Sequence, residues 1–295
     1  MFTYMRKKDL YIFLTFCFLL IGCRQRNADK FDFISVSIEP QRYFAEKIVG
    51  DKFEVRTLVP NGSSPESFDP APSQMVDLSK SKAYFMIGLF AFEKVRAVSL
   101  GQSNPGMLLV DCSRNMAHAR RKQEVNGHEH DGHGHDGLDP HIWNSPETAL
   151  GVAKNILKGV VQIDPANKVF YEANYRKLER EIQETDSIVR HKLADVKPRA
   201  FIIYHPALSY FAEEYGLEQY TVESHGKAPS PSQMVELVNF SKQKGIKTVF
   251  VQPEFDRKNA EVLAKEIGAN VVEINPLAYD WKGEMKKIAE SLEKQ

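Results

Sequence analysis

Residues Asp164 to Pro198 read DPANKVFYEANYRKLEREIQETDSIVRHKLADVKP and hold the longest helical pattern in the chain. Apolar residues recur there at steps of mostly three and four, the period of one helix face. These residues are Tyr171, Tyr175, Leu178, Ile182, Val189, Leu193 and Val196. Some thirty residues at about 1.5 Å each give a rod of roughly 45 Å, long enough to cross from one domain to another. Because the chain contains one such segment, we predict a linking helix at 165–197 rather than a coiled-coil partner.

Strand-like and helix-like segments alternate on both sides of this helix, which predicts βα units and parallel sheets. Before it we expect strands at 33–38, 53–59, 83–87 and 108–110 and helices at 43–49, 73–79 and 146–161. After it we expect strands at 199–204, 248–251 and 271–274 and helices at 207–215, 231–244, 258–267 and 280–294. The predicted fold class is α/β, with two βα lobes joined by one long helix and a ligand cleft between them.

A short internal repeat supports two related halves. The segment PSQMVDL at 72–78 recurs as PSQMVEL at 231–237, and an apolar strand follows the helix in both copies. Repeated segments of this kind indicate a duplicated structural unit. We therefore place the N-terminal lobe at 31–164 and the C-terminal lobe at 198–295.

The first 22 residues have the features of an export signal. A basic end at Arg6 to Lys8 precedes an apolar core at Leu10 to Ile21, and Leu20-Ile21-Gly22-Cys23 is similar to a bacterial lipobox. The alternative, an uncleaved membrane helix, is disfavoured because the apolar run is short for a bilayer. We expect Cys23 to be lipidated and residues 23–30 to form a tether. The protein would then be an exported lipoprotein that is anchored in a membrane and lies in the periplasm or at the cell surface.

Charge and cysteine content exclude some classes of protein. The formal net charge is zero with no basic stripe, which argues against a nucleic-acid partner. If Cys23 carries lipid, Cys112 has no partner, so the fold does not depend on a disulfide. We expect a monomer.

A histidine-rich segment precedes the linking helix. Residues 126–137 read NGHEHDGHGHDG, which is Gly-rich and lacks apolar periodicity, so we expect a loop. Neutral imidazoles bind Zn, Cu and Ni. A solvated spacer would not need four histidines, so we interpret His128, His130, His133 and His135 as an auxiliary metal-binding loop.

A fixed metal site should lie at the carboxyl ends of parallel strands, where loops line the ligand crevice. Metal-competent side chains stand in such loops from both halves; they are Glu66, His141, His205 and Asp280. Each residue alone is weak evidence for a metal site, and the evidence is strong only because all four lie at the ends of strands. His225 is a candidate extra ligand with a surface position as the alternative, and we interpret His118 and His191 as surface residues.

The mature chain resembles the solute-binding lipoproteins of zinc and manganese ABC importers. The family's Pro-His-x-Tyr/Phe-x-Pro loop corresponds to PESFDP at 65–70, and its Asp-Pro-His motif to 139–141. Its third ligand opens the segment HPALSYF at 205–211, and its fourth, an acid after a Pro-Leu turn, matches Asp280. The resemblance implies two α/β lobes, a long linking helix, and partnership with an ABC permease and its ATPase.

One difference from the family pattern affects which metal we expect the site to bind. Glu66 stands where the family usually has His, and an oxygen ligand favours harder ions such as Mn. The histidine loop and His205 favour the zinc branch, so we expect a zinc receptor, with a manganese or iron receptor as the alternative. A zinc hydrolase would keep an open coordination position, and the chain lacks His-Glu-x-x-His. A metal-binding adhesin is a further alternative.

Overall fold

The structure is a computed structural model that describes residues 32–116, 138–223 and 227–295. Residues 33–295 form one compact unit. The export signal, the tether with Cys23, the histidines at 118–135 and His225 lie outside the described residues. Within the described ranges, no helix combines the length and apolarity needed to cross a membrane.

The N-terminal lobe is built on a parallel four-stranded sheet. Its strands are β1 (Phe33–Val36), β2 (Glu54–Thr57), β3 (Ala83–Met86) and β4 (Leu108–Asp111), in the order β2-β1-β3-β4. The connecting helices are α2 (Glu39–Val49), α3 (Pro72–Leu78) and α4 (Ala91–Ser103), and α5 (Pro146–Ile163) follows. The side chain of Ser145 caps α5 by accepting a hydrogen bond from the Thr148 amide, as its position before Pro146 predicts.

The C-terminal lobe repeats this topology. Its strands are β5 (Ala200–Ile203), β6 (Glu218–Thr221), β7 (Thr248–Val251) and β8 (Asn270–Glu273), in the order β6-β5-β7-β8 and all parallel. The helices are α7 (Ser209–Tyr215), α8 (Pro231–Lys244), α9 (Arg257–Ile267) and α10 (Trp281–Glu293). The repeated segment begins α3 in one lobe and α8 in the other, between the second and third strands of each. The two-lobe parallel α/β fold is therefore confirmed.

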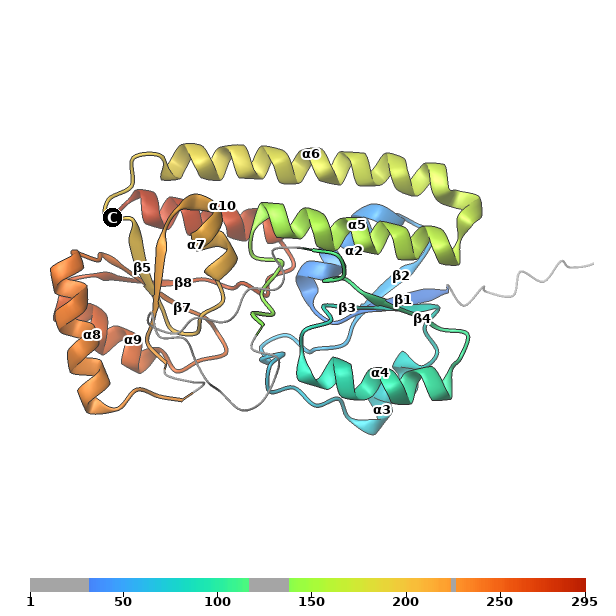
Figure 1. The fold of residues 1–295 in the computed structure, drawn as a ribbon, viewed down its shortest axis with the longest axis horizontal. Coiled ribbons are helices and arrows are strands. Elements are labelled where there is room, and N and C mark those ends of the chain that lie inside the picture. Colours follow the sequence, from blue (N-terminus) through green and yellow to red (C-terminus); the bar gives the residue numbers. More distant parts are fainter. Residues whose placement is uncertain (1–31, 117–137, 224–226) are drawn as a thin grey trace, which may run out of the picture. The chain divides into compact units, whose positions relative to one another are not determined.

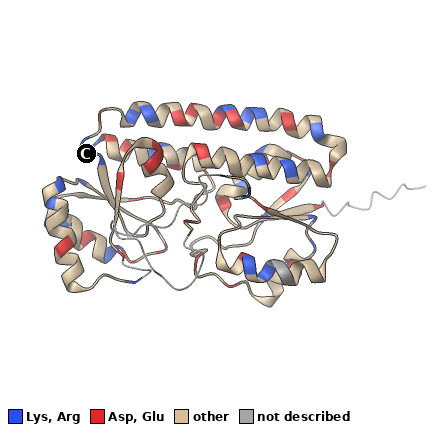
Figure 2. Ribbon diagram, viewed as in Figure 1, with Lys and Arg blue, Asp and Glu red and all other residues tan. Residues whose placement is uncertain are grey.

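The long helix α6 (Lys168–Leu193) follows a short turn, η2 (Pro165–Asn167), and packs on α5, α2 and α10 (Figure 1). Its buried residues are Tyr171, Leu178, Ile182, Thr185, Val189 and Leu193. All of these except Thr185 belong to the apolar face expected from the sequence, and Tyr175 of that face is half-buried. Acidic and basic residues alternate along the length of α6 (Figure 2). Glu181 pairs with Lys47 of α2 and Lys282 of α10, so one residue of α6 contacts a helix of each lobe.

One hydrophobic core continues from the N-terminal sheet under α6 into the C-terminal lobe. It contains Phe85 of β3, Ile182 of α6 and Trp281 of α10, and a smaller cluster covers the other face of the second sheet. Since a shared close-packed core deforms little, the lobes are held as one body.

Two elements differ from the sequence predictions. Helix α4 was not expected, because Gly101 and β-branched residues weaken its helical pattern. Strand β6 was not expected either, because its residues, EQYT, lack the apolar run of the other strands of this sheet and lie at the sheet edge. In addition, α2 starts at Glu39 rather than at residue 43, with Pro40 in its first turn.

Candidate metal centre

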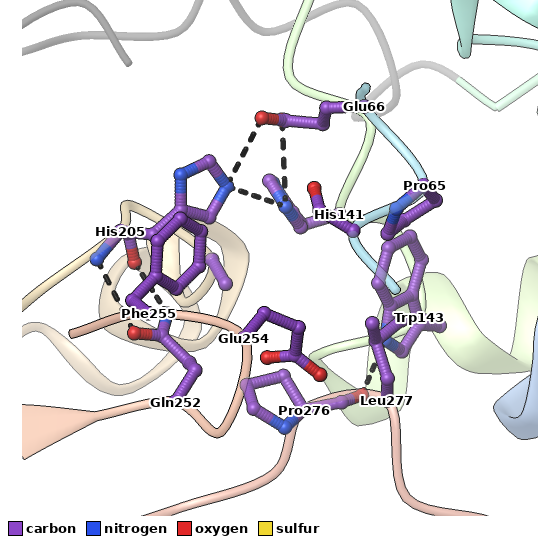
Figure 3. A pocket seen from close by; sticks show the side chains of 12 residues that line it. Pro65, Glu66, His141, Trp143, His205, Gln252, Glu254, Phe255, Pro276 and Leu277 are labelled. Carbon is purple, nitrogen blue, oxygen red and sulfur yellow. Dashed lines mark hydrogen bonds and ion pairs between the residues drawn. The ribbon is translucent and has the colours of Figure 1, made fainter. Parts of the chain in front are cut away.

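Three predicted ligands converge on one point. Glu66 comes from the loop after β2, His141 from the segment between β4 and α5, and His205 from the end of β5 (Figure 3). Their ligand atoms all lie within 4.8 Å of one another. Both imidazoles are buried, at 4% and 6% exposure, while Glu66 remains accessible. The cleft between the lobes thus gathers two nitrogens and a carboxylate.

The spacing of these atoms fits one small cation. The two Nε2 atoms are 3.3 Å apart, and the Glu66 oxygens lie 3.3 Å from His205 Nε2 and 3.7 Å from His141 Nε2. Tetrahedral zinc with bonds of about 2.0–2.1 Å separates neighbouring ligand atoms by roughly 3.3–3.4 Å. The three side chains therefore stand close to the positions that a tetrahedral ion requires.

His141 is oriented by its own loop. The Asp139 carboxylate accepts hydrogen bonds from His141 Nδ1, at 2.8 Å, and from the His141 amide, at 2.9 Å. The Tyr210 hydroxyl holds the Asp139 carbonyl. Because a carboxylate can only accept, Nδ1 carries the proton and Nε2 faces the site, as in the carboxylate–histidine pairs of metal centres.

His205 has the equivalent arrangement in the other lobe. Its Nδ1 lies 2.8 Å from Glu223 Oε1, and its backbone is held by the Gln252 side chain, which accepts from the amide and donates to the carbonyl. Burial disfavours protonation of His205, but the hydrogen bonds to Glu223 and Glu66 outweigh it and raise its pKa to about 10. A proton therefore occupies His205 where a metal would bind.

The space between these side chains is small. A cavity of about 20 Å³ is lined by the three ligands together with Trp143, Phe255, Pro276 and Leu277, among others. Phe255 stacks on His205 with ring centroids 5.1 Å apart, and Trp143 lies 5.3 Å from His141. Since a cavity needs about 10–15 Å³ to hold one water, the space between these side chains is about the size of a single ion or water.

Hydrogen bonds between the lobes fix the cavity wall. Trp143 Nε1 donates to the Pro276 carbonyl at 2.7 Å, and Trp281 Nε1 donates to the Trp143 carbonyl at 2.6 Å. Both indoles are buried. Nearby, Asn144 donates to the Ala207 carbonyl. The segment that carries His141 is thereby attached directly to the lobe that carries His205.

Asp280 does not join this group. Its carboxylate accepts a hydrogen bond from the Gly283 amide at 3.0 Å and caps α10. The turn before it places Pro276 and Leu277 against the cavity, and Asp280 lies three residues further, at the start of the helix. His191, expected at the surface, is exposed on α6.

Several residues of the site were not identified from the sequence. Asp139 and Glu223 orient the imidazoles, while Gln252 and Glu254 follow β7 and line the cavity. The strand order reverses between β5 and β7, and His205, Gln252 and Glu254 follow these two strands. The rule that ligands bind beyond such strand ends could have identified the loop after β7 from the sequence.

Comparison with known proteins identifies similar chains. Residues 34–295 match the family model described as zinc-uptake complex component A, periplasmic (ZnuA). The high-affinity zinc uptake system protein ZnuA of Bacillus subtilis is 28% identical over 284 residues, which cover 92% of this chain and 89% of that protein.

Solved structures agree with this match. A crystal structure of ZnuA has a TM-score of 0.80 and 34% identity, covering 88% of this chain and 97% of its own. A zinc-bound deletion mutant of ZnuA has a TM-score of 0.79 at 34% identity, covering 88% of this chain and 96% of its own.

Proposed function

The chain belongs to the family of periplasmic A components of zinc-uptake complexes, and on that premise we propose that it is the zinc receptor of an ABC uptake system. It captures a divalent cation outside the cytoplasmic membrane and delivers it to a permease that is driven by a separate ATPase. The observation that carries this proposal is the convergence of Glu66, His141 and His205 on a cavity of about 20 Å³.

The family match supports binding over catalysis. Imidazole nitrogens and a carboxylate suit zinc, and the matching family is a component of a zinc-uptake complex. We therefore infer that the protein acts as a receptor and not as a zinc hydrolase.

Its position in the cell follows from the family and the first residues of the chain. The matching family is described as periplasmic, and Leu20-Ile21-Gly22-Cys23 is similar to a lipobox. We infer that the protein is an exported lipoprotein held at a membrane through Cys23, beside the permease that it serves.

Competition with a chromophoric chelator tests the site. The unmutated protein binds one zinc tightly, and His141→Ala and His205→Ala each reduce its affinity by 100-fold or more. Bound zinc raises the melting temperature of the unmutated protein, because the tight site exists only in the folded chain. His191→Ala, on the exposed face of α6, serves as the control. Unchanged affinity in either site variant would exclude this site.

A further inference from the structure

The turn at 275–280 joins β8 to α10 and forms one wall of the metal cavity. Pro276 and Leu277 line that cavity (Figure 3), and Asp280, which matches the family's fourth ligand, ends the turn. The first half of the turn is attached to the N-terminal lobe, because Trp143 donates a hydrogen bond to the Pro276 carbonyl. The position of this backbone therefore affects the shape of the metal site.

A second attachment lies near the other end of the turn, at Tyr279. Its hydroxyl donates to Glu46 Oε2 of α2 at 2.6 Å. The Arg42 guanidinium lies 5.3 Å from the centre of the Tyr279 ring, and the Tyr43 ring meets it edge-on at 5.7 Å. Both distances fall within the ranges of favourable cation–π and aromatic contacts. One side chain of the C-terminal lobe thus contacts three residues of a helix in the N-terminal lobe.

The acceptor of the Tyr279 hydroxyl is itself held in place. Arg42 Nε donates to Glu46 Oε1 at 2.7 Å, and an Arg42 Nη1 atom lies 3.4 Å from a Glu39 oxygen. Glu46 therefore uses one carboxylate oxygen for Arg42 and the other for Tyr279. Hydrogen bonds to an ionised acceptor are stronger than those between neutral groups, so this contact is more than a casual surface approach.

Tyr279 also borders a space between the lobes that packing does not fill. A cavity of about 320 Å³ shares Leu277 with the metal cavity, and Ala278 and Tyr279 line it from the C-terminal lobe. Ile38 and Glu39, at the start of α2, line it from the N-terminal lobe. On this side, therefore, the contacts of Tyr279 with α2 attach the turn to the other lobe.

From these contacts we propose that Tyr279 is a positioning residue of the metal site, which fixes the turn at 275–280 on α2 and thereby slows release of the bound ion. The role rests on the proposed receptor function. A site binds tightly when the residues around its ligands are locked by packing and hydrogen bonds. Loosening such a support weakens binding, and losses of this kind are expressed mainly as faster dissociation.

The rate of zinc release tests this role. Stopped-flow mixing of the zinc-loaded protein with excess chromophoric chelator measures it. Tyr279→Phe keeps the ring but removes the hydroxyl, so we expect release to be about three- to tenfold faster, as for the loss of one hydrogen bond. Glu46→Ala should speed release to a similar extent, and the double variant should be no more than about twofold faster than either single variant.

A matched control removes a similar hydrogen bond that does not join the lobes. Tyr175 donates to Glu179 within α6 at 3.3 Å, so Tyr175→Phe loses the same chemical contact away from the turn. We expect release from Tyr175→Phe to change by less than about twofold.

The melting temperature of the metal-free protein separates positioning from a general contribution to stability. Trp281 is buried and packs edge-on against Phe44 of α2, with ring centroids 5.4 Å apart, so α10 stays in place without the Tyr279 hydroxyl. We therefore expect metal-free Tyr279→Phe to melt within about 3 °C of the unmutated protein. A larger fall in the melting temperature would assign Tyr279 a structural role and overturn the proposal.

Three results of the release experiment would also overturn it. They are a rate in Tyr279→Phe within about twofold of the unmutated protein, equal acceleration in Tyr175→Phe, and fully independent effects of Tyr279→Phe and Glu46→Ala in the double variant. In each of these cases the unmutated protein still binds zinc tightly. Failure of the receptor function would appear differently, as an unmutated protein without a tight zinc site.

Discussion

His205 is a ligand whose charge should change when a metal binds. Its pKa of about 10 keeps the imidazole protonated at neutral pH in the metal-free protein, through Glu223 and Glu66. A metal ligand must be neutral, so binding releases this proton. The pKa of His205 in the folded protein exceeds the ordinary value of 6.5. The interactions of its imidazolium with Glu223 and Glu66 therefore stabilise the metal-free fold fully below pH 6.5, and less as the pH rises toward 10.

Zinc affinity should therefore rise with pH, by up to tenfold per unit between pH 7 and 9. Calorimetry in two buffers with different ionisation enthalpies should show about one proton released per zinc at pH 7.5. Glu223→Gln lowers the pKa of His205, so this variant should release fewer protons per zinc than the unmutated protein. Glu218→Gln, at the surface, should release as many protons as the unmutated protein. Equal proton release in all three proteins would contradict the role of the Glu223 pair.

Glu66 should set the preference between zinc and manganese. Glu66→His replaces a charged oxygen by a nitrogen, which suits zinc better than the harder manganese ion. We expect the ratio of zinc to manganese affinity to rise by at least tenfold. Glu66→Gln separates charge from shape, and both variants are titrated with each metal in one chelator buffer. A ratio that neither variant moves would mean that Glu66 is not a ligand.

At the scale of elements, α6 owes its position to one apolar face. Ile182 is fully buried on that face, whereas Val169 of the same helix is 76% exposed. Ile182→Ala should reduce the free energy of unfolding by about 2–5 kcal/mol, because it removes packed methyl groups and leaves a cavity. Val169→Ala should change it by less than about 0.5 kcal/mol. Urea unfolding checks both, and similar losses in the two variants would contradict the assigned face.

The elements also show what sequence patterns can determine. The α6 face and the Ser145 cap follow from periodicity and local hydrogen bonding, which depend on neighbours in sequence. His205 was predictable because it directly follows a strand of apolar residues. Asp280 was placed at the site because it follows the last strand and matches the family's fourth ligand, but in the structure it caps α10, which depends on tertiary geometry. Glu223 and Gln252 contact His205 only because β6 and β7 pair with β5.

At the scale of the whole molecule, the shared core under α6 and the tryptophan hydrogen bonds limit how far the lobes move. We expect zinc binding to change the radius of gyration by less than about 1 Å, because the backbone of preorganised proteins moves by only about 1 Å or less on binding. Small-angle X-ray scattering of the metal-free and zinc-loaded protein measures this change. A decrease of several ångströms would indicate hinge closure of the lobes and contradict a rigid linking helix.

The central claim is that the cleft between the lobes holds the metal. A crystal structure of the zinc-loaded protein, with anomalous data collected on both sides of the zinc absorption edge, locates the ion directly. Our account predicts one strong peak at bonding distance, about 2.0–2.2 Å, from His141 Nε2, His205 Nε2 and a Glu66 oxygen. A peak bound elsewhere on the chain, with these three side chains free of metal, would contradict it.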